Sequence, residues 1–148
     1  MDDAFDPQRF ADAQNAVWTQ VRAELAAGAK RSHWMWFVFP QLRGLGRSAT
    51  ARHYGLGSLD DARAYWRHAL LGLRLKDCTD LVLAVRGRSA LQIFGPPDDL
   101  KFRSCMTLFE AAAPDEPVFA RALETYFAGA RDAATLALLP QEIGRAHV

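Results

Sequence analysis

The chain has 148 residues and a mass of 16.5 kDa, half of its residues are hydrophobic and 24% are charged, which is typical of one globular domain. At this length, folding buries about two-thirds of the surface without help from a metal or disulfides, and two cysteines are too few for a disulfide framework. No apolar run is long enough to span a membrane, the first residues are acidic, and a net charge of +1 argues against a surface built wholly for nucleic acid, so we expect a cytoplasmic single domain over residues 1–148.

Helical patterns begin near the N-terminus and return after residue 58. Asp6 is a candidate N-cap, and apolar residues at three- to four-residue spacing predict a first helix that ends at Gly28. Ser58, followed by two acidic residues, predicts the start of a second helical stretch. This stretch extends to Gly87, and Gly72 near its middle is a candidate break between two helices.

In the C-terminal half, the sequence predicts a short turn and three more helices. Ser89 caps a short turn, and Asp98 caps a helix that continues to about Ala113, where a proline stops it. A further helix covers about 117–128, and Asp132 caps a last short one.

The segment from Trp34 to Phe39 is the one candidate strand, because it is short, aromatic and bounded by a proline. One strand cannot form a sheet. The sequence therefore predicts an all-α domain of six to eight helices with a single short extended segment near Trp34–Phe39.

A basic and aromatic segment interrupts the helical pattern between Glu24 and Asp60. It contains no acidic residue but five Lys and Arg residues, interleaved with five Trp, Phe and Tyr residues. Such interleaving is typical of a site for a nucleotide or a single strand. The candidate ligand-binding residues, including one from a later helix, are His33, Trp34, Trp36, Gln41, Arg43, Gly44, Gly46, Arg47, Ser48 and Ser104.

The turn from Gly44 to Ala49 matches the Gly-x-Gly-x-x-Ala form of a dinucleotide-binding fingerprint. That fingerprint must follow a buried parallel strand, and no βαβ unit is predicted here, so we reject this interpretation. Two others stay open. The glycines with Ser48 form an anion cradle at the start of a short helix, or they are simply a turn between two helices.

The aromatic residues of this segment also have two interpretations. Trp36, Phe37 and Phe39 fit a buried plug of a small helical domain, and the same argument places Trp36 and Phe109 in the core. In the ligand interpretation, Trp34 or Trp36 stacks on a flat group instead.

A second informative segment is the helix expected to begin at Asp98. Lys101 borders its apolar stripe, with Ser104 beyond it. A desolvated lysine can act as a base or nucleophile or bind an anion, whereas a pair with Asp98 one turn away would merely support the helix. Asp98 and Lys101 are the candidate catalytic residues, and we expect Lys101 to lie near the turn from Gly44 to Ser48.

The chain contains two long motifs. The first motif comprises His33, Trp34, Met35, Trp36, Phe39, Pro40, Gln41, Gly44, Leu45, Gly46 and Ser48, and the second comprises Phe94, Gly95, Asp98, Lys101, Ser104, Met106, Thr107, Leu108 and Phe109. In these motifs the sequence resembles a bacterial family, the domain of unknown function numbered eighteen-ten. The resemblance spans nearly the whole chain and implies a small, mainly helical single-domain protein without an established activity.

These patterns support two functional hypotheses. In the first, the domain binds a small anionic ligand, such as a nucleotide or phosphosugar. An enzymatic form of this hypothesis is cleavage of a glycosidic bond, with Asp98 as the carboxylate and Lys101 as the cation. In the alternative, Arg31, Arg43, Arg47 and Arg52 form an exposed patch for a protein or RNA partner. Neither needs a cofactor or metal, and convergence of the arginines with Lys101 on one cleft would favour the first.

Overall fold

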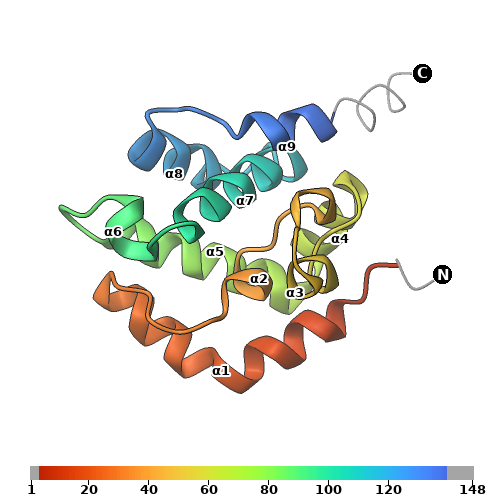
Figure 1. Cartoon of the computed structure of the whole chain (residues 1–148), viewed down its shortest axis with the longest axis horizontal. Helices are drawn as coiled ribbons and strands as arrows, with labels where there is room; N and C mark the ends of the chain where they lie inside the picture. Colours follow the sequence, from red (N-terminus) through yellow and green to blue (C-terminus); the bar gives the residue numbers. More distant parts are fainter. Residues whose placement is uncertain (1–3, 140–148) are drawn as a thin grey trace.

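The computed structural model describes residues 4–139, in which nine α-helices and one 3₁₀ helix follow one another (Figure 1). The all-α prediction is confirmed: in this part of the chain the one β-type contact is a parallel bridge between Leu42 and Leu56. Five helices have nine residues or more, and four shorter ones raise the number above the six to eight expected. The elements are α1 (Pro7–Ala27), α2 (Met35–Val38), η1 (Arg43–Leu45), α3 (Ala49–His53), α4 (Leu59–Arg67), α5 (Ala69–Ala84), α6 (Ala90–Phe94), α7 (Asp98–Ala112), α8 (Val118–Phe127) and α9 (Ala133–Leu138).

Most of the predicted helix starts are confirmed by side-chain caps. Asp6, Ser58, Ser89 and Asp132 each accept a hydrogen bond from a backbone N–H in the first turn of the following helix. These contacts lie within three residues along the chain, which is why the sequence reveals them. Asp98 differs, because it is the first residue of α7 rather than its cap.

The expected break at Gly72 is wrong, since the helices divide at His68. His68 ends α4, and its Nδ1 accepts hydrogen bonds from Leu70 N and Leu71 N at the start of α5. Gly72 has another reason to be glycine. A Cβ at this position would lie 2.1 Å from the carbonyl oxygen of Trp66, so only glycine allows the end of α4 to pack this closely on α5.

The extended segment predicted at Trp34–Phe39 is also wrong, because Met35–Val38 is the helical turn α2. A tertiary contact holds this turn in place: the buried Gln14 of α1 donates from Nε2 to Phe37 O at 2.7 Å. The turn buries Trp34 and Phe37 while Trp36 is left partly exposed, a division that strand alternation does not produce.

The core lies between α5, which contacts α1 and α8, and α7, which contacts α4, α6, α8 and α9 (Figure 1). Aromatic rings of α7 pack against α4 and against the residue that follows α2. Phe39 meets Phe102 edge to face at 5.1 Å between ring centroids, and Tyr65 lies 5.4 Å from Phe109. Phe109 is fully buried, as predicted. Among residues 4–139, none of the helices has the length and hydropathy needed to cross a membrane.

Candidate functional site

The two sequence motifs meet along a groove between α2, the segment 41–51 and the first turns of α7. The groove consists of a first hollow of about 570 Å³, a second of about 370 Å³, and a narrow gap between them, and Lys101 lines all three. We call this feature the Lys101 groove. The expected proximity of Lys101 to the turn from Gly44 to Ser48 is thus found, because Gly46, Arg47 and Ser48 line the first hollow with it.

Lys101 is held at the middle of the groove by two weak contacts. Its ammonium lies 5.3 Å from the ring centroid of Trp36 and 3.7 Å from Asp98 Oδ1. Asp98 lies one turn away on α7, and Trp36 belongs to α2 on the other side of the groove. The side chain of Lys101 is 26% exposed. An ammonium in this position stays accessible to an anion entering either hollow.

The stronger partner of Asp98 is Lys30, a residue that was not among the predicted site residues. Lys30 Nζ lies 2.8 Å from Asp98 Oδ2, donates to Ser32 O at 2.6 Å and lies 5.1 Å from the ring centroid of Trp34. Its side chain is only 7% exposed. Lys30 therefore fixes one oxygen of Asp98 and leaves Oδ1 on the side of Lys101.

The loop that carries Lys30 is anchored by the buried carboxylate of Glu24 in α1. Oε1 accepts hydrogen bonds from Arg31 N at 2.8 Å, Ser32 N at 3.1 Å and Trp34 Nε1 at 2.9 Å, and Oε2 accepts from Ser32 Oγ. Burial alone raises the pKa of this carboxyl, but the bonds from Ser32, Arg31 and Trp34 outweigh it and lower the pKa to about 2. Glu24 thus orders the wall of the second hollow without lining it.

The two tryptophans differ in burial, and Trp34 is the one in the core. Trp34 is 1% exposed and its indole N–H is bonded to Glu24, so Trp34 cannot stack on a ligand and its expected ligand-binding role is wrong. Trp36 is partly exposed and lines the second hollow, so its assignment to the core is wrong. Phe37 and Phe39 are buried, as the plug interpretation expected.

Two of the residues expected to hold an anion do not line the groove. A Cβ on Gly44 would lie 3.2 Å from Leu138, which places this glycine beside α9. The guanidinium of Arg43 lies next to Gly57, with Nη1 3.2 Å from the position of a Cβ there. Neither borders the first or second hollow, because η1 turns the chain between Leu42 and Gly46.

The segment 43–55 is a loop closed at its neck by backbone contacts. Arg43 N donates to Leu56 O at 2.7 Å, and Leu56 N donates to Gln41 O at 3.0 Å. Gly55 is required at this crossing, since a Cβ would lie 2.4 Å from Arg43 Cα. Within the loop, Ser48 accepts from Ala51 N and caps α3, as predicted.

The remaining predicted residues lie in one or the other hollow. Gln41 and Ser104 line the first hollow, and His33 lines the second and is exposed. Ser104 Oγ donates to Leu100 O at 3.1 Å, whereas the side-chain amide of Gln41 makes no hydrogen bond within residues 4–139. Gln41 is therefore available to a ligand.

The groove carries more positive than negative groups. Lys30, Arg31, Arg47 and Lys101 line the two hollows, against the carboxylates of Asp98 and Asp132. Asp132 is committed to α9, because it accepts from Thr135 N at 2.9 Å and from Thr135 Oγ1 at 2.6 Å. Arg52, like Arg43, lies outside both hollows, so the arginines converge only in part. In the described part of the chain, His, Cys, Asp and Glu side chains form no cluster suited to a metal ion.

Comparisons with known proteins agree with the motifs. A model of the family described as "Protein of unknown function (DUF1810)" matches residues 4–139. A crystal structure of the conserved hypothetical protein Rv1873 from Mycobacterium tuberculosis is similar with a TM-score of 0.90 and 56% sequence identity, over 91% of this chain and 96% of that chain. None of the curated proteins compared with the chain matches it. These findings support the fold and assign no activity.

Proposed function

Since this chain belongs to the DUF1810 family, whose function is unknown, we propose from its own geometry that it binds a small phosphorylated ligand of the nucleotide or phosphosugar kind in the Lys101 groove. The observation that carries this proposal is the meeting of Lys101, Arg47 and the exposed part of Trp36 in one groove. Two cations with a flat aromatic surface are what a phosphate attached to a ring requires.

Each part of the ligand has a partner in this proposal. The phosphate lies in the first hollow and contacts Lys101 and Arg47, for which the nearest carboxylate within residues 4–139 is Asp98, at 3.7 Å from Lys101. The unbonded amide of Gln41 donates to the same group. A ring packs on Trp36, and sugar hydroxyls donate to Asp98 Oδ1, because Lys30 already occupies Oδ2.

The geometry supports binding better than cleavage of a glycosidic bond. Glycoside hydrolysis normally uses two carboxyl groups on either side of the bond. Asp98 is one candidate, but the second carboxylate of the groove, Asp132, is bonded to Thr135 at the start of α9. Asp98 and Lys101 remain the residues that any chemistry in this groove would use.

The experiment is a thermal-shift titration with AMP, ADP, ribose 5-phosphate and, as the uncharged control, adenosine. A ligand at a hundred times its Kd adds about 2.7 kcal/mol, which for a domain of this size raises the Tm by roughly 5–10 °C. Lys101→Met keeps the aliphatic stem and removes the charge, so it should abolish the shift while the Tm of the free protein changes little. Arg52→Gln is the matched control, because Arg52 is exposed and lies on the same loop outside the hollows.

Two results would contradict the proposal: no shift with any phosphorylated compound at millimolar concentration, or a shift that Lys101→Met leaves intact. The alternative, a module for RNA or protein, makes a different prediction. Its affinity for single-stranded RNA would fall with Arg43→Gln and Arg52→Gln, and would decrease with added salt, while Lys101→Met would have no effect.

A further inference from the structure

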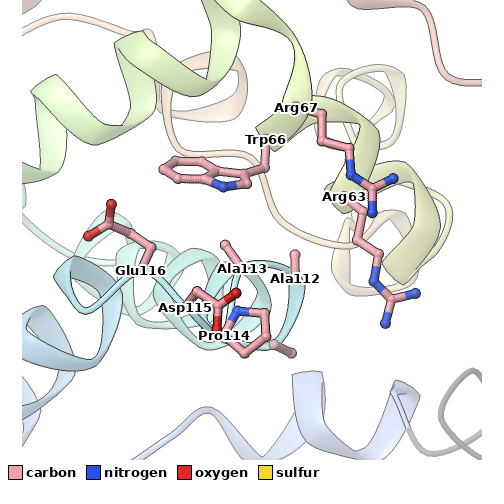
Figure 2. A pocket seen from close by; sticks show the side chains of 9 residues that line it. Arg63, Trp66, Arg67, Ala112, Ala113, Pro114, Asp115 and Glu116 are labelled. Atoms are coloured by element: carbon pink, nitrogen blue, oxygen red, sulfur yellow. The ribbon is translucent and has the colours of Figure 1, made fainter.

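A separate cavity lies away from the Lys101 groove and shares no lining residue with it. It is a cleft of about 630 Å³ between the end of α4 and the turn that joins α7 to α8 (Figure 2). We call it the Trp66 cleft. Its lining comprises Arg63, Trp66 and Arg67 from α4 and the segment 111–116. Its size is within the range of small-ligand sites.

One wall of the Trp66 cleft is positive. Arg63, Trp66 and Arg67 are three and four residues apart, so the helical repeat places them on one side of α4. Arg63 lies 2.8 Å from the exposed carboxylate of Asp60. Arg67 is exposed, and its guanidinium makes no ion pair or hydrogen bond within residues 4–139. An anionic group at this wall would therefore meet one unpaired guanidinium and one that is paired only at the surface.

The opposite wall is negative. It is formed by the end of α7, where the last carbonyls of a helix carry a partial negative charge, and by Asp115 and Glu116. Glu116 is partly committed, because it accepts from Val118 N at 3.1 Å and lies 3.8 Å from Lys76. Asp115 is exposed and unpaired in the described part of the chain. This wall suits a group that donates hydrogen bonds and carries a positive charge.

Between the two walls lies the indole of Trp66. Figure 2 shows Arg63 and Arg67 on one side of this ring and Glu116 on the other. Trp66 is half-buried and meets Phe119 edge to face at 5.3 Å, which holds the ring in position. Its remaining surface offers an apolar contact between two groups of opposite charge.

We propose that the Trp66 cleft binds an α-amino acid with an aromatic or apolar side chain, as its zwitterion. The carboxylate contacts Arg63 and Arg67, the ammonium contacts Asp115 and the end of α7, and the side chain packs on Trp66. A phosphate or nucleic acid would face Asp115 and Glu116 across the cleft. A wholly apolar ligand would desolvate charges on both walls without pairing them. A zwitterion satisfies both, and this site is independent of the Lys101 groove.

The test uses L-phenylalanine with two analogues that each lack one charge, phenylacetate and phenethylamine. Binding is followed in the 148-residue chain by ¹⁵N NMR, with the indole N–H of Trp66 and the backbone N–H groups of 111–113, Asp115 and Glu116 as reporters. L-phenylalanine should shift these signals in the millimolar range or below. Each analogue should bind at least about fivefold more weakly, because each leaves one charged wall unpaired.

The variants Arg67→Gln and Asp115→Asn change exposed residues, so the fold is not at risk. Each should weaken L-phenylalanine at least about fivefold. Arg67→Gln should leave phenethylamine unaffected, and Asp115→Asn should leave phenylacetate unaffected. Arg121→Gln, an exposed change on α8 outside the cleft, is the matched control and should have no effect. The proposal is overturned if L-phenylalanine does not shift the Trp66 signal, or if either analogue binds as tightly as the amino acid.

Discussion

Replacing Glu24 by glutamine tests how the wall of the second hollow is held. The carboxylate is 8% exposed and receives four hydrogen bonds from the loop that follows α1. Its pKa falls from 4.5 to about 2, and since each pKa unit corresponds to about 1.4 kcal/mol, ionised Glu24 contributes at most about 3.5 kcal/mol to the free energy of unfolding. This is a large part of a typical total of about 5–15 kcal/mol. We expect Glu24→Gln to lose about 2–3 kcal/mol at neutral pH.

The pH dependence distinguishes this mechanism from a general packing defect. Because the pKa of the folded state is lowered, the contribution of Glu24 is complete above pH 4.5 and is lost as the pH falls from 4.5 towards 2. Urea unfolding of both proteins, followed from pH 7 to about pH 3, should show the gap between them narrowing by about 2 kcal/mol. Asp80→Asn, an exposed change, is the control. A gap that stays constant over this range would refute the reasoning.

Three further outcomes can be measured on stability and reactivity. Gly72→Ala should destabilise the protein by at least about 2 kcal/mol in urea, because its Cβ would lie 2.1 Å from Trp66 O; an unchanged midpoint would contradict the close packing of α4 on α5. Phe109→Ala should cost about 3–5 kcal/mol and Trp36→Ala clearly less, since the first is fully buried and the second is not; equal losses would return Trp36 to the core. Burial raises the pKa of both cysteine thiols, so Ellman's reagent should label neither until the protein unfolds, and immediate labelling at neutral pH would be inconsistent with this packing.

The features that the sequence predicts well are those fixed by nearby residues. Ser58 and Ser89 cap helices through contacts three residues away, so their role is visible without the tertiary structure. The division between α4 and α5 is not. A glycine in the middle of a helical stretch indicates a break, but Gly72 is glycine because a side chain there would meet Trp66 O in the preceding helix. The break falls instead at His68, whose side chain accepts hydrogen bonds from the first turn of α5.

The candidate site was predicted in part for the same reason. Lys101 stands at the border of an apolar stripe, a local pattern, and this identified it. Lys30 is buried through its contact with Asp98, which lies far along the chain, and no spacing rule connects the two. The different burial of Trp34 and Trp36 also depends on a tertiary contact, because Glu24 accepts a hydrogen bond from the indole of Trp34 and holds that ring in the core.

The loop 43–55 is fixed to the core at its closed neck, so its exposed residues, which form one wall of the groove, can change with little effect on the stability of the domain. Leu42 and Leu56 are buried and join the loop to the core, whereas Arg47 and Ser48 are exposed within it. Compact loops whose ends are fixed tolerate replacement between their anchors better than the elements they connect. The exposed part of the loop is therefore a unit that evolution or protein engineering can exchange. Grafting another sequence over residues 44–50, with the buried Ala51, the core-packed Tyr54 and Gly55 at the crossing retained, should redirect what the groove accepts while the helical scaffold stays the same.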